Sequence, residues 1–251
     1  IIDEYARVTG DEAFMRRYGL EVVVEVARFV ASRLERGDDG QYHIARTIGP
    51  DEDRDPGLDN GFTMLMARRA LRVAADWLER LQANASATVA ELAERCRLAP
   101  DQAARWRALA EAVHVPEVPD LGIPLQDEYL LDKKTADVAG WRLREAPAHW
   151  AISKQESRDY RLIKQADIVL AAFLLEDEFT PAQRARIYDF YEPMTLHISS
   201  LSWNTHAIVA ARLGRVAEAY DYYGNCAGLD LDDVKEATAD GLHAAALGGG
   251  W

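Results

Sequence analysis

The spacing of apolar residues constrains the fold of this chain more than any other feature. Apolar side chains recur at intervals of three and four over most of its length, which is the period of helices buried on one face. Cap-forming residues and prolines separate these segments. The spacing predicts about eight helices, over residues 11–34, 60–81, 86–96, 100–113, 159–175, 181–191, 203–213 and 216–227, and a short helical or turn segment at the end.

Few segments outside these helices have the character of strands. Residues 41–48 alternate in polarity and predict a short extended piece, while residues 116–157 predict a long loop with one or two short strands. In the first predicted helix, the inward-facing stripe is expected to consist of Phe14, Tyr18, Val22, Val26, Phe29 and Val30. No fixed period recurs, which argues against a helical-repeat solenoid. The pattern predicts an all-α fold, either a helix-hairpin toroid or a large bundle.

Composition and charge exclude several classes of function. The chain has 251 residues, 49% of them hydrophobic, which suffices for one large domain or a piece of a larger one. A formal net charge of −13 argues against a nucleic-acid or anionic-membrane partner, although a few local donors are enough to bind one phosphate group. No apolar run approaches the ~20 residues of a membrane span, and the first residues lack the pattern of a signal peptide.

Cysteine and histidine residues indicate neither a disulfide framework nor a metal site. Cys96 and Cys226 are far apart and lie within helical patterns, so we expect buried free thiols in a reducing compartment, which suggests a cytoplasmic protein. The six histidines have no ligand spacing, so no metal is expected.

The stretch TIGPDEDRDPGLDNG, residues 47–61, concentrates acidic residues in a segment that cannot be regular helix. Gly49 and Pro50 form a sharp turn that aims the following side chains. Asp51 and Asp53 flank Glu52, and close like charges raise the pKa of at least one carboxyl, which suits a proton donor. A solvated turn is the alternative, and composition alone favours it.

Two further patches carry polar groups next to apolar segments. Lys164 and Gln165 precede a strongly apolar run and offer donors that suit sugar hydroxyls, although both could equally pack at a helix end. His197, Ser199 and Ser200 lie just before a predicted helix, where hydroxyls and free backbone amides can bind an anion. Ordinary helix capping is the alternative there. A serine nucleophile is not supported, because the glycine-flanked nucleophile elbow is lacking.

In their order along the chain, these patches and their flanking segments resemble glycoside hydrolase family 65, which contains the maltose, trehalose, kojibiose and nigerose phosphorylases and some hydrolases. The resemblance runs through the whole chain. It rests on the segments AFMRRYGLEVVVEVARFVASR, GQYHIARTIGPDE, YRLIKQADIVLAAFLLEDEFTPAQRARIYDFYEP, HISSLS, HAIVAARLGRVAEAYDYY, LDLDDV and DGLHAAALGGGW.

The resemblance implies a role for each patch. Glu52 falls at the family's catalytic general acid, Lys164 and Gln165 at residues that bind the glucosyl unit, and the segment of His197, Ser199 and Ser200 at the phosphate site. The implied fold is an (α/α)6 barrel, preceded by a β-sandwich domain and followed by a small β-sheet domain. The implied reaction is inverting phosphorolysis: Glu52 protonates the departing oxygen, and phosphate attacks from the opposite face to yield β-glucose 1-phosphate and free sugar. No cofactor is expected, since phosphate is a co-substrate.

The chain also departs from the family pattern. Asp53 and Arg54 replace the usual aromatic residue and histidine after Glu52, which bears on the acceptor sugar, and Ile198 replaces an acid beside the phosphate segment. Glu192 is the nearest acid before that segment. A barrel of six helix pairs needs about twelve helices, and the family's upstream Trp-Asp segment does not appear. Residues 1–251 are therefore expected to form the C-terminal two-thirds of the catalytic barrel, with its N-terminal part missing.

An unclosed barrel exposes helix faces, so we expect a homodimer, and this chain alone is expected to be inactive. The expected partners are a small sugar and phosphate, without nucleic acid or membrane. Two alternatives stay open. One is an inverting α-glucosidase, which requires a second carboxylate about 6.5–9.5 Å from Glu52. The other is a non-catalytic remnant that binds a sugar or a partner helix.

Overall fold

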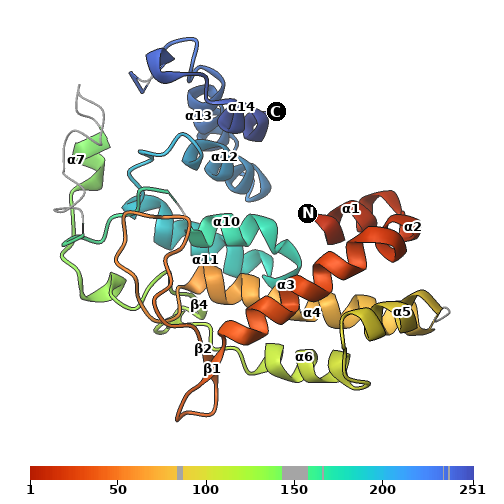
Figure 1. Ribbon diagram of the computed structural model, residues 1–251. Coiled ribbons are helices and arrows are strands. Elements are labelled where there is room, and N and C mark those ends of the chain that lie inside the picture. Colours follow the sequence, from red (N-terminus) through yellow and green to blue (C-terminus); the bar gives the residue numbers. More distant parts are fainter. Residues whose placement is uncertain (84–86, 143–157, 166, 234, 237) are drawn as a thin grey trace. The chain divides into compact units, whose positions relative to one another are not determined.

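The structure, a computed structural model, describes residues 1–83, 87–142, 158–165, 167–233, 235–236 and 238–251 (Figure 1). The chain forms two compact units, one of residues 1–45 and 63–114 and the other of residues 46–62 and 115–251. Helices predominate in both units and the strands are short, which confirms a mostly helical fold.

The first unit consists of helices and one short hairpin. Its elements are α1 (Ile2–Thr9), α2 (Glu12–Phe14), a π-helical turn (Met15–Gly19), α3 (Leu20–Arg33), β1 (Glu35–Arg36), β2 (Tyr42–His43), most of α4 (Gly61–Ala83), α5 (Ala87–Arg95) and α6 (Gln102–Glu111). The strands β1 and β2 pair antiparallel, with Glu35 opposite His43. The bounds of α4, α5 and α6 lie close to those predicted, whereas the sequence pattern does not indicate α1. Ser86, the predicted cap of α5, lies outside the described residues.

The predicted inner stripe of the first helix is wrong. Tyr18, Val22, Val26 and Phe29 are exposed, with 66% of Phe29 accessible. The buried face of α3 is formed instead by Leu20, Val23, Val24 and Ala27. The π-helical turn explains the error, because its wider turn shifts the phase of the helix between Phe14 and Leu20. A stripe extrapolated from one side of this turn therefore reaches the wrong face on the other.

The second unit carries every site residue expected from the sequence. Its elements are β3 (Glu117–Val118), β4 (Ile123–Pro124), α7 (Val138–Arg142), α10 (Asp167–Leu174), α11 (Pro181–Tyr191), α12 (Ser202–Arg212), α13 (Val216–Ala227) and α14 (Ala244–Gly250), with single 3-10 turns at Leu130–Asp132, Glu176–Glu178, Glu192–Met194 and Thr238–Asp240. The strands β3 and β4 fall in the region predicted as a loop with short strands, part of which, residues 143–157, lies outside the described residues.

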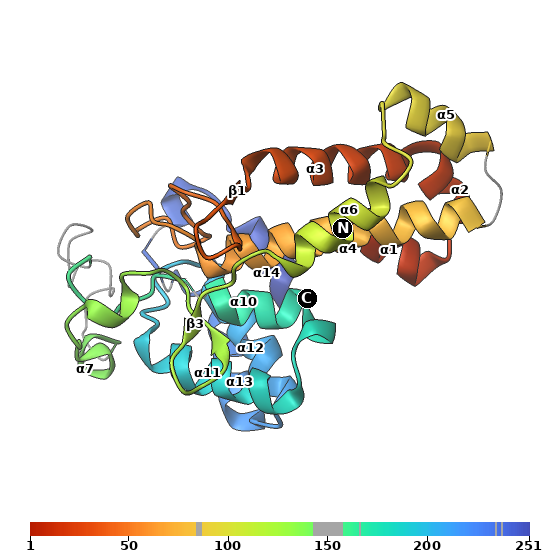
Figure 2. The same ribbon diagram turned by 90° about the horizontal axis from the view of Figure 1, so that it is seen from below.

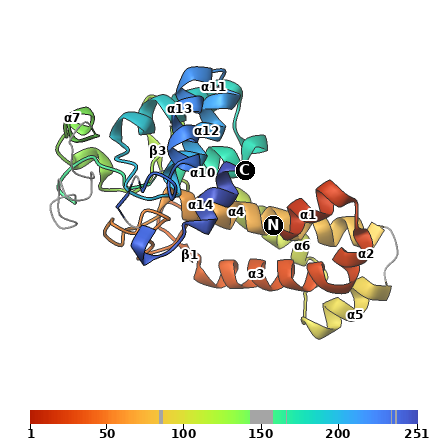
Figure 3. The same ribbon diagram turned by 90° about the horizontal axis from the view of Figure 1, so that it is seen from above.

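Helices α10 to α13 form the core of the second unit. Helix α12 packs against α13 and α10, and α10 packs against α11 (Figures 2 and 3). Most of α10 is apolar, and Ile168 and Val169 are fully enclosed. Helix α11 begins where the sequence predicts, because Pro181 stands in its first turn and Thr180 and Gln183 form a capping box. The 3-10 turn Glu192–Met194 and the residues up to Leu201 connect α11 to α12.

The predicted helix over residues 159–175 is too long, since α10 begins at Asp167. The preceding residues form β-bridges instead: Lys134 pairs with Tyr160, and Ile163 pairs with Thr195. Leu162 and Ile163 are buried, and these buried residues continue the apolar spacing of α10 and so imitate a helical pattern. Lys164 and Gln165 thus lie in a bend before the helix rather than in its first turn.

Cys96 and Cys226 are both buried free thiols, as predicted. Over the residues that the structure describes, no helix combines the length and the apolar character needed to cross a bilayer.

Candidate active site

The acidic stretch forms a closed loop in the second unit, which we call the acid loop (residues 47–57). An antiparallel bridge joins its ends: the backbone N–H of Thr47 donates to the carbonyl oxygen of Gly57 at 2.9 Å, and the reverse bond measures 3.1 Å. The Thr47 hydroxyl also accepts from the N–H of Asn60 at 3.0 Å, directly before α4. The loop is therefore a defined structure and not a freely solvated turn.

A buried ion pair anchors the acid loop from within. The Arg54 guanidinium donates to both oxygens of Asp127, at 2.9 Å and 3.3 Å, and both side chains are 5% exposed. Arg54 also donates to the carbonyl oxygen of Leu162 at 3.2 Å. A bidentate arginine–carboxylate pair fixes the relative orientation of the two side chains and also compensates their charges. Arg54, which departs from the family pattern, thus binds the loop to the protein interior and does not face an open cleft.

Glu52 lies at the exposed tip of this loop, where both predicted sugar-binding residues contact it. The Lys164 side-chain amine donates to Oε1 of Glu52, and the Gln165 amide donates to Oε2 at 3.0 Å. The Gln165 amide also donates to the carbonyl oxygen of Pro50. The side chain of Glu52 is 53% exposed and that of Lys164 is 23% exposed. The structure thus brings Glu52, Lys164 and Gln165 together at the surface of the second unit.

The pKa values of this pair reflect its geometry. Partial burial raises the pKa of Glu52, but the hydrogen bond and charge of Lys164 outweigh burial and lower it below its ordinary value. Burial lowers the pKa of Lys164, and its bond to Glu52 together with the charge of Asp53 reverses this and raises it. With Lys164 in place, Glu52 is therefore ionised at neutral pH.

A parallel backbone bridge connects this group to the predicted phosphate segment. Ile163 donates through its N–H to the carbonyl oxygen of Met194 at 2.9 Å, and its own carbonyl accepts from Leu196 at 2.8 Å. Lys164 follows Ile163 directly, and His197 follows Leu196. Within the described residues, no hydrogen bond or ion pair joins Glu52 itself to His197, so the bridge provides the structural connection between the two groups.

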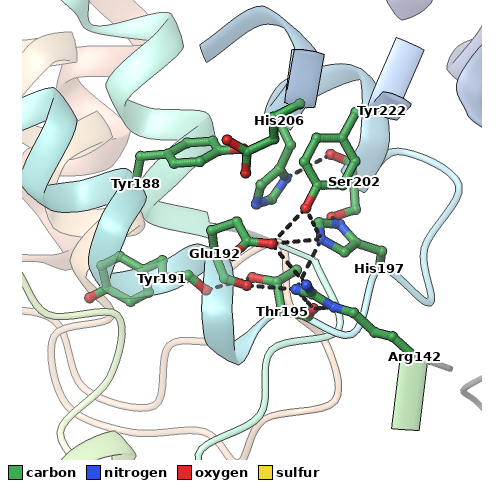
Figure 4. Close-up of polar contacts among 10 residues, drawn as sticks. Arg142, Tyr188, Tyr191, Glu192, Thr195, His197, Ser202, His206 and Tyr222 are labelled. Carbon is green, nitrogen blue, oxygen red and sulfur yellow. Dashed lines mark hydrogen bonds and ion pairs between the residues drawn. The ribbon is translucent and has the colours of Figure 1, made fainter. Parts of the chain in front are cut away.

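His197 lies in a polar cluster with Arg142, Glu192, Ser202, Tyr222 and His206, which we call the histidine cluster (Figure 4). His197, Ser202 and His206 are buried, and the other three residues are partly buried. Oε1 of Glu192 accepts from Arg142 at 2.8 Å and from the Tyr222 hydroxyl at 2.6 Å. Nε2 of His197 lies 3.1 Å from the Tyr222 hydroxyl and 3.2 Å from Arg142, and Nδ1 lies 2.9 Å from the Ser202 hydroxyl. Both ring nitrogens of His197 thus have protein partners.

Burial and charge determine the protonation states in this cluster. His197, Tyr222 and Arg142 hold the pKa of Glu192 well below its ordinary value despite burial, so Glu192 is ionised. Burial lowers the pKa of His197 to about 3 and that of His206 to about 4, so both rings are neutral. In this arrangement His197 holds the loop that follows it, and its backbone has the left-handed φ of 55° that begins the turn.

Residues 198–201, which we call the serine loop, lead from His197 into α12. Leu201 donates through its N–H to the Ser199 hydroxyl at 3.3 Å, and Ser202 donates to the carbonyl oxygen of Ser199 at 3.1 Å. The N-cap of α12 makes no side-chain capping bond, because Leu201 occupies that position and the Ser202 hydroxyl contacts His197. Ser199 and Ser200 are partly exposed, so their hydroxyls and the helix N-terminus form an accessible group of donors.

Lys235 adds a positive charge at this end of α12. Its amine donates to the carbonyl oxygen of His197 and lies 4.2 Å from the centre of the Trp203 ring. Burial lowers the pKa of Lys235 to about 8. Among the described residues, no carboxylate lies within ion-pair distance of it. A lysine so placed is available to pair with an anion at the serine loop.

Sequence reasoning missed Arg142, Tyr222 and Lys235. Their partners lie 25 to 55 residues away in the chain, so no local spacing indicates them. Lys235 follows the acidic run LDLDD and has the pattern of a solvated charge. As for metals, the described part of the chain contains no group of three or more histidine, cysteine, aspartate or glutamate side chains that could hold one.

Comparison with known proteins places this site in context. The chain is 34% identical over 249 residues to the kojibiose phosphorylase of Halothermothrix orenii. The matched region covers 98% of this chain and 32% of that relative. It is 36% identical over 250 residues to the α,α-trehalose phosphorylase of Geobacillus stearothermophilus, covering 99% of this chain and 32% of the relative. The chain therefore spans about a third of the length of these relatives.

A solved structure assigned as a kojibiose phosphorylase from the human microbiome matches 100% of this chain and 34% of its own, with a TM-score of 0.86 and 27% identity. The family model of the glycosyl hydrolase family 65 central catalytic domain matches residues 1–251. The ordered motifs, the mostly helical fold and these matches agree. The chain belongs to glycosyl hydrolase family 65 and corresponds to its central catalytic domain.

Proposed function

We propose that the whole protein to which this chain belongs catalyses inverting phosphorolysis of an α-linked glucose disaccharide, yielding β-glucose 1-phosphate and free sugar. One observation carries the proposal: Lys164 and Gln165 hold Glu52 at the protein surface, and an isolated β-bridge between Ile163 and Thr195 links their segment to the one that leads to His197. The phosphorylase relatives support the reaction class.

In the proposed mechanism Glu52 is the general acid. The donors that now hold its carboxylate, Lys164 and Gln165, are groups that can bind sugar hydroxyls instead. When a sugar takes these donors, Glu52 loses the positive charge that lowers its pKa and can hold a proton for the glycosidic oxygen. Substrate binding would thus prepare the acid as well as orient the glucosyl unit.

Phosphate is the proposed nucleophile, bound at the serine loop. Ser199 and Ser200 would donate hydroxyl hydrogen bonds, the N-terminus of α12 would contribute backbone N–H groups, and His197 would hold the loop in shape. Attack from the face opposite Glu52 inverts the anomeric carbon. No cofactor is required in this proposal, because phosphate is itself the anion that attacks.

The architecture proposed for the whole protein is an (α/α)6 barrel, with residues 1–251 forming the C-terminal two-thirds of it. The mostly helical units and the solved relative support this proposal. A homodimer and a cytoplasmic location remain predictions from the sequence.

Hydrolysis is the competing reaction, and it requires a carboxylate that activates water. Glu192 is the nearest acidic residue before the serine loop in the sequence. Its Oε1 atom accepts hydrogen bonds from Arg142 and Tyr222. A carboxylate held ionised by an arginine is a weak base, so this contact argues against Glu192 in that role.

The test uses the full-length protein. It is incubated with α-linked glucose disaccharides with and without phosphate, and β-glucose 1-phosphate is followed by proton NMR, which also reports the anomeric configuration. The proposal expects β-glucose 1-phosphate to form from the disaccharide only when phosphate is present. Equal glucose release without phosphate would identify a hydrolase, and sugar binding without any turnover would identify a non-catalytic protein.

A further inference from the structure

Two fully buried carboxyl groups lie directly beneath the candidate general acid. Asp51 precedes Glu52 in the acid loop, Asp167 begins α10, and both side chains are 0% exposed. The backbone N–H of Asp51 donates to Oδ1 of Asp167 at 2.7 Å. The proposed mechanism gives neither carboxyl a role, and a buried carboxyl pair is costly unless its charges are compensated.

The Asp51 carboxylate acts as an acceptor at both oxygens. Its Oδ2 accepts from the backbone N–H of Lys164 at 3.1 Å and from the Gln126 amide at 3.3 Å. Its Oδ1 accepts a longer bond from the N–H of Asp53 at 3.4 Å. Three donors converge on this group, which favours its ionised form. Asp51 therefore holds Lys164 by its backbone while the Lys164 side chain reaches Glu52.

Asp167 has the opposite surroundings. Its Oδ1 accepts from Asp51, whereas its enclosed Oδ2 makes no hydrogen bond within the geometric limits among the described residues. The Asn60 amide lies beside this carboxyl and lowers its pKa, but burial and the charge of Asp51 outweigh that effect. A Cβ atom at Gly49 would lie 2.1 Å from this Oδ2, so the acid loop passes directly against it and the glycine is required there. A buried ionised oxygen without a donor costs far more free energy than a buried neutral carboxyl group does.

The pKa shifts of the two carboxyl groups also favour a proton on Asp167 rather than on Asp51. Burial raises the pKa of Asp51 to about 6, while burial and the charge of Asp51 raise that of Asp167 well above its ordinary value. Arg54 lowers the pKa of Asp51 but does not cancel the effect of burial. The charged or titratable groups that act on the two carboxyls are Arg54, Asp53, Asp127, Lys164 and Tyr191.

We propose that Asp51 and Asp167 form a positioning pair that carries one proton at neutral pH, with Asp167 neutral and Asp51 ionised, and that Asp51 places Lys164 against Glu52. The inference rests on the proposed function in taking Glu52 as the acid. Because neither carboxyl faces the surface, both act through the residues they hold. Loss of the Asp51 charge at low pH would release the Lys164 N–H and disturb the geometry of the acid.

The experiment compares Asp51→Asn, Asp167→Asn and Asp189→Asn in the full-length protein. Asp189 is a matched control, because it is an exposed aspartate in the same unit, 59% accessible, that pairs with Arg215. Asp167→Asn mimics a neutral carboxyl, so we expect kcat/KM within about threefold of wild type. Asp51→Asn removes the negative charge and replaces one of the two acceptor oxygens, which three donors share, by an NH2 group, so we expect a loss of about 100-fold and a raised KM for the sugar.

Two further readouts separate positioning from a merely structural role. Infrared spectroscopy at neutral pH should show a protonated carboxyl band that disappears in Asp167→Asn and remains in Asp189→Asn. The acidic limb of the pH profile of kcat/KM, expected near the Asp51 pKa of about 6, should vanish in Asp51→Asn and persist in Asp167→Asn.

Equal losses in Asp51→Asn and Asp167→Asn, or a carboxyl band that survives in Asp167→Asn, would overturn the inference. Wild-type turnover tests the proposed function separately. If the wild type hydrolyses the disaccharide instead, the ratio of kcat/KM between each variant and the wild type is measured for hydrolysis. If it has no turnover, glucose binding measured by calorimetry serves as the readout, and Asp51→Asn is expected to weaken it about tenfold more than Asp167→Asn.

Discussion

The Lys164 amine donates a hydrogen bond to the Glu52 carboxylate, although 112 residues separate them in the chain. The contact joins the tip of the acid loop to the bend that precedes α10. Lys164 would thus serve two purposes in the proposed function, since it holds the acid before the sugar arrives and binds the sugar afterwards.

Replacing the proposed general acid should remove the help that Glu52 gives to the leaving group. We expect Glu52→Gln to lower kcat for phosphorolysis by about 10²–10⁴-fold. The KM for phosphate should change little, because no hydrogen bond joins Glu52 to the serine loop in the described residues. Steady-state kinetics of the full-length protein measures both constants.

A glucosyl substrate with a good leaving group provides the control for this variant. The fluoride ion of α-glucosyl fluoride leaves with little need for a proton, so Glu52→Gln should recover most of the wild-type rate on this substrate. An equal loss on the fluoride and on the disaccharide would mean that Glu52 does not act as the acid.

Lys164 should control the pH dependence of the reaction through its charge. Because Lys164 favours the ionised form of Glu52, its removal raises the pKa of Glu52 and keeps the carboxyl protonated to higher pH. We therefore expect the alkaline limb of kcat/KM in Lys164→Met to move to higher pH, with a raised KM for the sugar. In the wild type, the limb of kcat should lie above that of kcat/KM, since bound sugar takes Lys164 from Glu52.

The matched control for this charge is Lys134→Met, because Lys134 is exposed and lies 5.9 Å from the Tyr160 ring. Its pH profile should coincide with that of the wild type. If Lys164→Met leaves the alkaline limb where it is, the ion pair with Glu52 does not govern the proton.

The ion pair between Arg54 and Asp127 should contribute to stability. Both partners are buried, so Asp127→Asn leaves an enclosed guanidinium without its countercharge and should lower the free energy of unfolding by about 3–5 kcal/mol. Denaturant unfolding measures this change. The exposed pair between Arg72 and Glu111 is the comparison, and Glu111→Gln should cost about 0–1 kcal/mol. Similar costs for the two variants would mean that the acid loop is not anchored as the structure indicates.

Lys235 should affect phosphate more than sugar. We expect Lys235→Met to raise the KM for phosphate about tenfold and to leave the KM for the sugar nearly unchanged. Because burial lowers the pKa of Lys235 to about 8, the wild type should lose the charge above that pH and its phosphate KM should then rise. This rise should be absent in Lys235→Met.

Loss of the bond from Lys235 to the His197 carbonyl could disturb the loop by itself, so Lys235→Arg is the second variant. Arginine keeps the charge at every pH tested and should restore phosphate binding without the rise above about pH 8. If the KM for phosphate is the same with Lys, Met or Arg at position 235, Lys235 does not belong to the phosphate site.

The amino-acid sequence by itself determined the mostly helical fold, because the period of apolar residues reports the buried face of each helix. It also located α11 and α13 closely, where Pro181 and the residues around Gly214 mark helix limits by local chemistry. The ordered motifs indicated the family. Local spacing placed Glu52 and His197 on loops, since turn-forming residues and helix starts are local signals, but it wrongly placed Lys164 within a helix.

Only the tertiary structure decided which of these loops meet and what holds them. The bridge between Ile163 and Thr195, the anchor formed by Arg54 and Asp127, and the contact of Asp51 with Asp167 join residues 32 to 116 positions apart. Such pairings depend on how the helices pack, and the same packing excludes water and so shifts the pKa values of the enclosed carboxyls. Periodicity carries information about neighbours one turn away, whereas desolvation and long-range contacts arise only when the whole chain is folded.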